Sequence, residues 1–398
     1  MADPIVMTLT MIIVGQICLS VPLLLTRGIK SAVYLPLALF LLANGILALG
    51  SMVNSLYPGW YVFYTAVSFP TLFILCPSLW FYVEGITSST PWKLHIKQLR
   101  HYFLLWPALV ISVMIMFLPT GMHTDIFIED VDVTDPFAIT LVVSILVMML
   151  LWLGQCVYTI FSIVRRLLAY RIQLKNLFSN NEDKELNWVN WLLLVAVCTW
   201  LFSLATVFSS NLFDNFLFNI RTEALLSLLL IWSLAHFGLQ QKPGLTGNGD
   251  NATINIKSQS DDENSNVDDR VFSTSKKYQR SALGAEQSDR IADKINAVMR
   301  EDNLYLDANL SMQKLASYVA ISPNYISQTL NETLSINFFD FVNQWRIEAA
   351  KPKILANQDT VLNIALEVGF NARSSFYKAF KQETGKTPSE FRKHYIQH

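Results

Sequence analysis

Long apolar runs dominate the first 240 residues of the chain, and polar sequence follows them. A helix needs about 20 mostly apolar residues to cross the hydrocarbon core of a membrane. The first run follows Asp3 rather than a basic stretch, and no small-residue cleavage site comes after it, so we do not expect a cleaved signal peptide. The pattern predicts seven transmembrane helices, over residues 5–25, 32–53, 60–83, 102–118, 137–164, 188–213 and 224–239.

Basic residues alternate between successive loops of this predicted bundle. The second loop has no Lys or Arg, the sixth has only Arg221, and the fourth, residues 120–136, has five acids and no base. Because Lys and Arg accumulate in cytoplasmic loops, the pattern predicts an outside N-terminus and a cytoplasmic C-terminus. The bases of the first, third and fifth loops are Arg27, Lys30, Lys93, Lys97, Arg100, Arg165, Arg166, Arg171, Lys175 and Lys184.

Composition supports a division into a membrane part and a soluble part. Charged residues make up 15% of the chain, against about 25% in soluble domains. Residues 1–240 hold 11 of the 30 Lys and Arg, whereas residues 277–398 hold 15. Ionisable residues inside spans usually mark a transport path, and the predicted spans are nearly free of them. We interpret His236, near the end of the last span, as a helix-contact or interfacial residue, and we disfavour a channel or pump.

Residues 241–287 are predicted to form a flexible cytoplasmic linker. The stretch is rich in Gly, Asn, Ser and Asp and has no apolar period. Such a composition cannot bury a core, so we expect it to be disordered. It separates the seven-span domain, residues 1–240, from a helical domain at residues 288–398.

The C-terminal domain is predicted to contain two helix-turn-helix motifs. In the first, Ser311 begins one helix, and Ser322 followed by Pro323 begins the next after a short turn. A helix, a tight turn and a second helix form the layout of DNA-binding proteins of this kind. The apolar pattern of residues 315–319 recurs at 364–368, a displacement of 49 residues.

Further signals set the expected limits of the remaining helices. A connecting helix is predicted at 338–356, in which Pro352 is expected to cause a kink or an early end. Gly369 is placed in the turn of the second motif, where glycine adopts a left-handed conformation most easily. The other expected helix ends are an N-cap at Ser288, an N-cap at Asn371, a stop at Gly385, and a capping box formed by Thr387 and Glu390.

The residues of the second motif resemble the signature of the AraC/XylS family of bacterial transcription regulators. The match begins with Arg346 and Ala350 and continues through Ile364-Ala365-x-x-x-Gly369-Phe370-x-x-x-Ser374-x-Phe376-x-Lys378-x-Phe380-Lys381 to Gly385-x-x-Pro388-x-x-Phe391-Arg392. Pro352 departs from the family pattern, and Lys378 stands where many members have Arg. The resemblance implies a DNA-binding unit whose two recognition helices enter successive major grooves of promoter DNA, with RNA polymerase as a further partner.

The expected DNA contacts lie on the outer faces of the two recognition helices. Residues 343–398 contain nine Lys and Arg against five Asp and Glu, a balance that suits phosphate binding. Amide and hydroxyl groups in the first motif suit base edges. Gly369 and Phe370 are interpreted as structural residues of the turn. The predicted DNA-binding residues are Asn324, Tyr325, Ser327, Gln328 and Asn331 in the first motif, and Arg373, Ser374, Ser375, Tyr377, Lys378 and Lys381 in the second.

Candidate chemistry of other kinds is sparse. The four cysteines are far apart in apolar runs, so neither a disulfide framework nor a zinc site is indicated. No glycine-rich phosphate loop or phosphotransfer motif occurs. We therefore expect no catalytic residue, no metal site and no cofactor, and we do not expect an enzyme.

Together these features predict an all-α, membrane-embedded one-component transcription regulator. It resembles the membrane-anchored members of the family, in which a several-span part replaces a soluble sensor barrel, so the expected location is the bacterial cytoplasmic (inner) membrane. A homodimer and an unknown ligand outside or within the bilayer are expected partners. Two alternatives stay open, namely a transporter fused to a regulator and a membrane-stored regulator released by proteolysis in 241–275.

Overall fold

The computed structural model describes residues 3–89, 92–124, 126, 135–180, 186–209, 220–241 and 284–396. These residues form helices, and the only β-type pairing among them is an isolated antiparallel bridge between Phe178 and Ser311. The chain divides into two compact units. The first comprises Met1–Leu168 and Leu186–Asp250, and the second comprises Ala169–Glu185 and Asn251–His398. The predicted linker falls mostly on 242–283, which lie outside the described residues.

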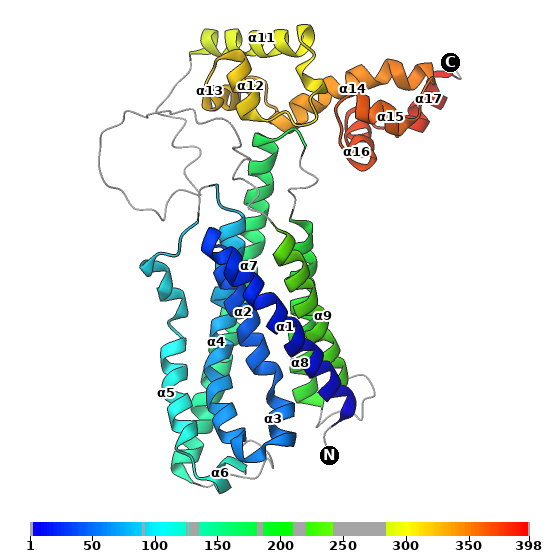
Figure 1. The fold of residues 1–398 in the computed structure, drawn as a ribbon. Helices are drawn as coiled ribbons and strands as arrows, with labels where there is room; N and C mark the ends of the chain where they lie inside the picture. Colours follow the sequence, from blue (N-terminus) through cyan, green and yellow to red (C-terminus); the bar gives the residue numbers. More distant parts are fainter. Residues whose placement is uncertain are drawn as a thin grey trace. The chain divides into compact units, whose positions relative to one another are not determined.

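The first unit is a set of apolar helices packed in neighbouring pairs (Figure 1). Helix α4 packs against α2 and α5, α1 packs against α2 and α9, and α8 packs against α9. Helix α7 joins α4 and α5 in one apolar core, where Trp152 donates a hydrogen bond of 3.0 Å to the Leu72 carbonyl. The elements are α1 Pro4–Lys30, α2 Tyr34–Ala48, α3 Gly50–Leu56, η1 Pro58–Trp60, α4 Tyr61–Ile86, η2 Ile96–Tyr102, α5 Leu105–Met116, α6 Thr120–Thr124, α7 Pro136–Leu177, α8 Asn187–Ser209 and α9 Ile220–Gln240.

Five helical stretches among the described residues are long and apolar enough to cross a membrane. They are Pro4–Lys30, Tyr34–Leu56, Pro58–Ile86, Pro136–Leu177 and Arg221–Gln240. A sixth results if η2 and α5, which meet at a bend of 50°, form one span. The stretch Asn187–Thr199 at the start of α8 is apolar but shorter. Each of the seven predicted spans thus overlaps apolar helix within the described residues, where five or six stretches meet the length of a span. Residues 210–213 of the predicted span 188–213 lie outside the described residues.

Helix α7 is longer than predicted. Four bases that we expected in the fifth loop, Arg165, Arg166, Arg171 and Lys175, lie on this helix, which continues to Leu177. These four residues therefore lie on a helix that continues beyond the predicted span 137–164, and not in irregular structure. Residues 165–177 contain no Gly or Pro, and an apolar stripe with buried side chains at Leu167, Tyr170 and Leu174 continues at helical spacing.

The second unit contains two small helical subdomains joined by α14 (Figure 1). The first core gathers apolar side chains of α11, α12, α13 and the start of α14, and the second gathers those of α14, α15, α16 and α17. The elements are α11 Ala285–Glu301, η5 Leu304–Leu306, α12 Met312–Val319, α13 Pro323–Gln328, the π-helical turn η6 Thr329–Thr333, α14 Phe338–Ala356, α15 Val361–Glu367, α16 Arg373–Thr384 and α17 Pro388–Ile396.

Most of the predicted helix ends in this unit are confirmed. The Ser311 hydroxyl accepts from the Lys314 amide at 3.3 Å, and the Ser322 hydroxyl accepts from the Tyr325 amide at 3.4 Å. Gly385 ends α16 with a positive φ of 74°. The expected capping box of α17 also forms, because the Thr387 amide donates to Glu390 at 2.8 Å and the Glu390 amide donates to Thr387 at 3.4 Å.

Two predicted helix limits are wrong, and Pro352 does not end its helix. Helix α11 begins at Ala285 after Gly284, so Ser288 is a buried residue inside it, because residues 285–287 are themselves good helix formers. Ala372, with an extended backbone, takes the cap position of α16 in place of Asn371. Helix α14 has the predicted bounds, Phe338–Ala356, and of the two effects expected at Pro352 the early end does not occur. Proline has no N–H to donate to the carbonyl one helical turn earlier. Because Pro352 is exposed, water can reach that carbonyl instead.

Candidate nucleic-acid interface

The two helix-turn-helix motifs have the same turn geometry, which confirms the repeat predicted from the sequence. Between α12 and α13, Ala320 has a φ of 53°, and the Ile321 amide donates to the Ala316 carbonyl at 3.1 Å. Between α15 and α16, Gly369 has a φ of 95°, and the Phe370 amide donates to the Ala365 carbonyl at 2.9 Å. Each bond spans five residues and closes the turn, so both motifs direct their second helix away from the first in the same manner.

The turn of the second motif is packed against the segment that precedes the first. A Cβ atom added to Gly369 would lie 2.7 Å from the Tyr305 carbonyl oxygen and 2.8 Å from that of Leu306. Glycine is therefore required twice, once for its positive φ and once for the space it leaves. Phe370, the next residue, is buried in the second core. Both residues thus contribute to packing inside the domain.

Arg346 of α14 lies under the same turn and is fully buried. Its Nε donates to the Tyr305 carbonyl at 2.8 Å, and its Nη2 donates to the Asp307 carbonyl at 2.9 Å. The guanidinium carbon lies 5.4 Å from the centre of the Phe370 ring. Burial lowers the pKa of Arg346 to about 10, which leaves it protonated at neutral pH. One side chain thus contacts both the segment before the first motif and the turn of the second motif.

The segment after α7 completes the coordination of Arg346. Nη1 of Arg346 donates to the Ser179 carbonyl at 3.3 Å, and Nη2 donates to the Ser179 hydroxyl at 3.2 Å. Ser179 is itself buried, and both its amide and its hydroxyl donate to the Leu310 carbonyl, at 3.1 and 2.7 Å. Leu177 packs against the first core. Sequence reasoning missed this contact, because nothing local to residues 177–180 indicates a partner more than 130 positions away.

The predicted contact residues of the first motif divide into exposed and buried sets. Asn324, Tyr325 and Asn331 are exposed, and Ser327 is half-buried. Gln328 is buried at 6% exposure and donates to Glu332 at 2.8 Å, so its expected place on the outer face is wrong. Helix α11 packs against α13 and η6. It therefore covers more of α13 and η6 than the side formed by Ile326 and Leu330.

The second motif presents most of its predicted contact residues to solvent. The exposed set is Arg373, Ser374, Lys378 and Lys381, whereas Ser375 and Tyr377 are half-buried. The Arg373 guanidinium lies 4.8 Å from the centre of the Tyr377 ring and donates to its hydroxyl at 2.9 Å. The ring therefore orients the arginine at the first turn of α16. The inner side of the helix is formed by Phe376, Ala379 and Phe380.

Not every base counted in residues 343–398 can meet a phosphate. Arg346 is buried, Lys351 pairs with Glu348, and Lys353 pairs with Glu367. Nε of Arg392 donates to the Ile354 carbonyl at 2.8 Å. The exposed positive charge of the second motif is thus concentrated on α16, with Lys393 on α17. Within the described part of the chain, no group of three or more His, Cys, Asp or Glu could hold a metal ion.

Comparisons with known proteins assign the C-terminal part of the chain. Residues 315–394 match the model of a helix-turn-helix domain family, and this C-terminal domain is of the AraC type. The chain is 36% identical over 100 residues to an uncharacterized HTH-type transcriptional regulator of Staphylococcus aureus (strain COL), an alignment covering 25% of this chain and 13% of the relative. It is 33% identical over 94 residues to the uncharacterized HTH-type transcriptional regulator YijO of Escherichia coli (strain K12), covering 24% of this chain and 33% of the relative.

A solved structure also aligns with this region. It is the C-terminal domain of the two-component response regulator yesN from Fusobacterium nucleatum subsp. nucleatum, at 26% identity and a TM-score of 0.23. The alignment covers 27% of this chain and 99% of that domain. The alignments with the Staphylococcus aureus and Escherichia coli regulators cover at most about a third of those proteins' length. They concern about a quarter of this chain.

Proposed function

Because the chain ends in an AraC-type helix-turn-helix domain, we propose that it is a transcription regulator that stays embedded in a membrane while it binds promoter DNA. The observation that supports this most strongly is the joint occurrence, in one polypeptide, of that domain and of five or six helices that could cross a membrane. Two helix-turn-helix motifs in one unit provide the DNA-binding surface without help from a second chain.

The DNA-binding role is supported by the residues exposed on the two recognition helices. Helix α13 offers Asn324 and Tyr325, and Asn331 follows in η6; their amide and hydroxyl groups suit base edges. Helix α16 offers Arg373 and Lys378, which suit guanine edges or phosphates. A buried Arg346 fixes the spacing of the motifs, and spacing decides whether two helices can occupy successive major grooves.

For the membrane part we propose seven spans, an outside N-terminus and a DNA-binding domain in the cytoplasm of a bacterium. The alternation of basic and non-basic loops supports this orientation. The bases of α7 at 165–175 lie at the end of the helix that follows its most apolar stretch, as expected for a helix that leaves the bilayer on the cytoplasmic side. We further propose a homodimer that responds to an unidentified ligand and contacts RNA polymerase.

The route we propose for the signal is the end of α7. The segment Ala169–Glu185, which includes the end of this helix, belongs to the C-terminal unit. Ser179, two residues after the helix, accepts from the Arg346 guanidinium through both its carbonyl and its hydroxyl. A shift of α7 would then alter the coordination of Arg346. The same contact disfavours a regulator released by proteolysis in 241–275, because the released fragment would lack Ser179 and leave donors of a buried charge unpaired.

The orientation is tested by placing single cysteines in a chain without native cysteine. A cysteine at Thr134 is expected to react with an impermeant thiol reagent in intact spheroplasts, whereas one at Asn187 is expected to react only after lysis. The reverse pattern would contradict the proposed orientation. Equal reactivity at both positions in intact cells would place both on one side and rule out the proposed topology.

A further inference from the structure

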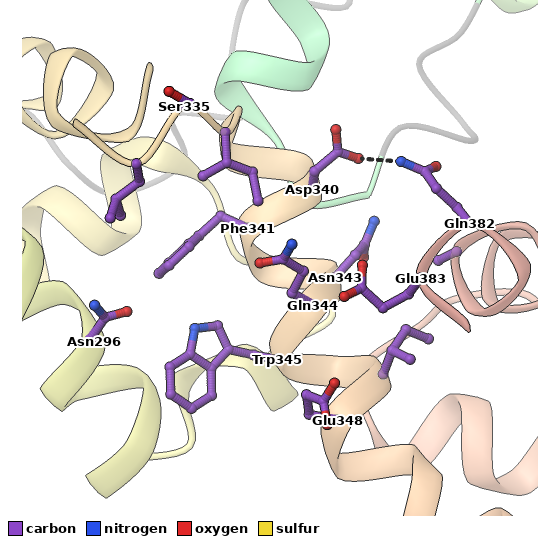
Figure 2. A pocket seen from close by; sticks show the side chains of 14 residues that line it. Asn296, Ser335, Asp340, Phe341, Asn343, Gln344, Trp345, Glu348, Gln382 and Glu383 are labelled. Atoms are coloured by element: carbon purple, nitrogen blue, oxygen red, sulfur yellow. Dashed lines mark hydrogen bonds between the residues drawn. The ribbon is translucent and has the colours of Figure 1, made fainter. Parts of the chain in front are cut away.

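A pocket of about 630 Å³ lies within the C-terminal unit, between α11, α14 and α16 (Figure 2). Pockets for small ligands usually measure about 300–1,000 Å³. Its walls include Asn296 of α11, the turn Leu334–Ile336, and Gln382 and Glu383 near the end of α16. Because these walls come from both subdomains, a molecule bound here would touch α11 of the first subdomain and α16 of the second helix-turn-helix motif together.

The pocket is acidic. Asp340, Glu348 and Glu383 line it, and no Lys or Arg is among its described lining residues. Lys351 pairs with Glu348 from outside the pocket, at 2.5 Å, and neutralises that charge. Asp340 accepts from Asn337 at 2.6 Å and from Gln382 at 3.5 Å, both neutral groups. Glu383 has no ion partner among the described residues. Two carboxylate charges thus remain without a counter-charge.

A buried amide in the same pocket is also without a partner. Asn343 is 5% exposed, and within the described part of the chain neither its Nδ2 nor its Oδ1 makes a hydrogen bond. A buried polar group left in this state destabilises the fold, so a ligand that bonds to it is favoured. Figure 2 shows the side chains of Asp340, Asn343 and Glu383 turned toward the pocket. The amide oxygen of Asn343 can accept from an ammonium group placed near the two carboxylates.

Apolar side chains form the rest of the wall. Leu334, Ile336, Phe341 and Trp345 line the pocket between the acidic positions. The two carboxylates without a counter-charge come from different helices, Asp340 from α14 and Glu383 from α16. A ligand that meets both of them and the apolar wall carries more than one positive group on a hydrocarbon chain. A half-buried indole such as that of Trp345 also attracts a cation to its face.

We propose that this pocket binds a small organic polyamine, an alkyl chain with two or more ammonium groups. Its charges lie against Asp340 and Glu383, one ammonium donates to Asn343, and its methylene groups lie along Trp345. Bound there, the polyamine links α16 to the subdomain of α11 and restricts the spacing of the two motifs. Polyamine binding itself does not depend on the proposed function. Only an effect of the bound polyamine on DNA affinity rests on the proposed function.

The test is a calorimetric titration of the full chain, in neutral detergent and without DNA, with spermidine. Saturable binding is expected, and Glu383→Gln is expected to weaken it about tenfold or more, the worth of one charge-assisted hydrogen bond. Glu301→Gln, a change at an exposed acid outside the pocket, is the matched control and is expected to leave the affinity unchanged. Because Glu383 is exposed and without an ion partner in the described structure, its variant is expected to unfold at the same temperature as the natural chain.

The outcomes are distinct. If the natural chain, Glu383→Gln and Glu301→Gln bind spermidine with equal affinity, spermidine binds only as a counterion. That result would overturn the proposal. Binding of an Arg- and Lys-rich peptide that spermidine does not displace would also overturn it, in favour of a protein-docking surface. A fully retained affinity for promoter DNA in Glu383→Gln without spermidine would show that the DNA-binding function does not depend on this site.

Discussion

The backbone of Gly369 lies directly against the carbonyl oxygen of Tyr305, so close that a Cβ at position 369 would approach it to 2.7 Å. The side chain of Arg346 fills the remaining space, with its Nε 3.0 Å from the same Cβ position. The turn of the second motif, the segment before the first motif and the connecting helix thus meet at one point. The relative position of the two recognition helices depends on this contact.

Substitution of Gly369 tests that contact. Gly385 is the matched control, because it too has a positive φ but a Cβ there would meet nothing within 4 Å. Gly385→Ala is expected to cost about 1–2 kcal/mol in the free energy of unfolding, from the backbone conformation alone. Gly369→Ala is expected to cost about 2 kcal/mol more, from overlap with two carbonyl groups. Denaturant unfolding of both variants measures the difference, and equal losses would contradict the packing described here.

The contact between Ser179 and Arg346 is expected to stabilise the segment before the first motif. Ser179→Ala removes one donor and one acceptor and is expected to cost about 1–2 kcal/mol. Amide hydrogen exchange should become faster at 305–311 and remain unchanged in α17. Ser317→Ala serves as the control, because the exposed Ser317 hydroxyl bonds only to the Gln313 carbonyl of its own helix. Unchanged exchange at 305–311 in Ser179→Ala would rule out a structural role for this contact.

Base reading is expected from Arg373 and not from Gln328. Arg373→Ala should cost about 1–3 kcal/mol at the cognate site and relax preference at one base pair. Lys381→Ala should weaken binding to all sequences alike and reduce the salt dependence. Gln328→Ala is expected to leave sequence preference unchanged, because the side chain is buried and bonded to Glu332. Binding measured on a library of single-base variants separates these cases, and a relaxed preference in Gln328→Ala would contradict its buried position.

The capping box of α17 predicts a dependence of stability on pH. The hydrogen bond from the Thr387 amide lowers the pKa of Glu390 below its ordinary value of 4.5. A lowered carboxyl pKa stabilises the fold above the unfolded value, and this contribution is lost as the pH falls through the folded value. The difference in melting temperature between the natural chain and Glu390→Gln should thus be constant at about pH 6–8 and shrink below about 4.5. A difference that is the same at all pH values would contradict this.

Features set by local sequence were predicted well. The caps at Ser311 and Ser322, the glycine turn at Gly369 and the repeat displaced by 49 residues depend on a few neighbouring residues, and all are present in the structure. The AraC-type domain was likewise recognisable from residues 346–392.

Features set by distant packing were not predictable in the same way. The burial of Gln328 goes with the packing of α11 against its helix, and the partner of Ser179 lies 167 residues away. The pattern of Leu167, Tyr170 and Leu174 could have shown that α7 continues, but the charged residues between them favoured a loop. Asn343 gave no signal at all, because only the folded α14 and α16 enclose it.

The proposed function requires that the full-length chain binds specific DNA from within the membrane. The most direct measurement is to cross-link cells, wash the membranes, isolate the full-length chain and sequence the DNA attached to it. We expect a small set of shared sites that is lost in the double variant Asn324→Ala, Arg373→Ala, while that variant remains in the membrane fraction. The proposed function would be contradicted if no DNA is attached to the membranes. It would also be contradicted if the natural chain and the double variant carry the same DNA fragments.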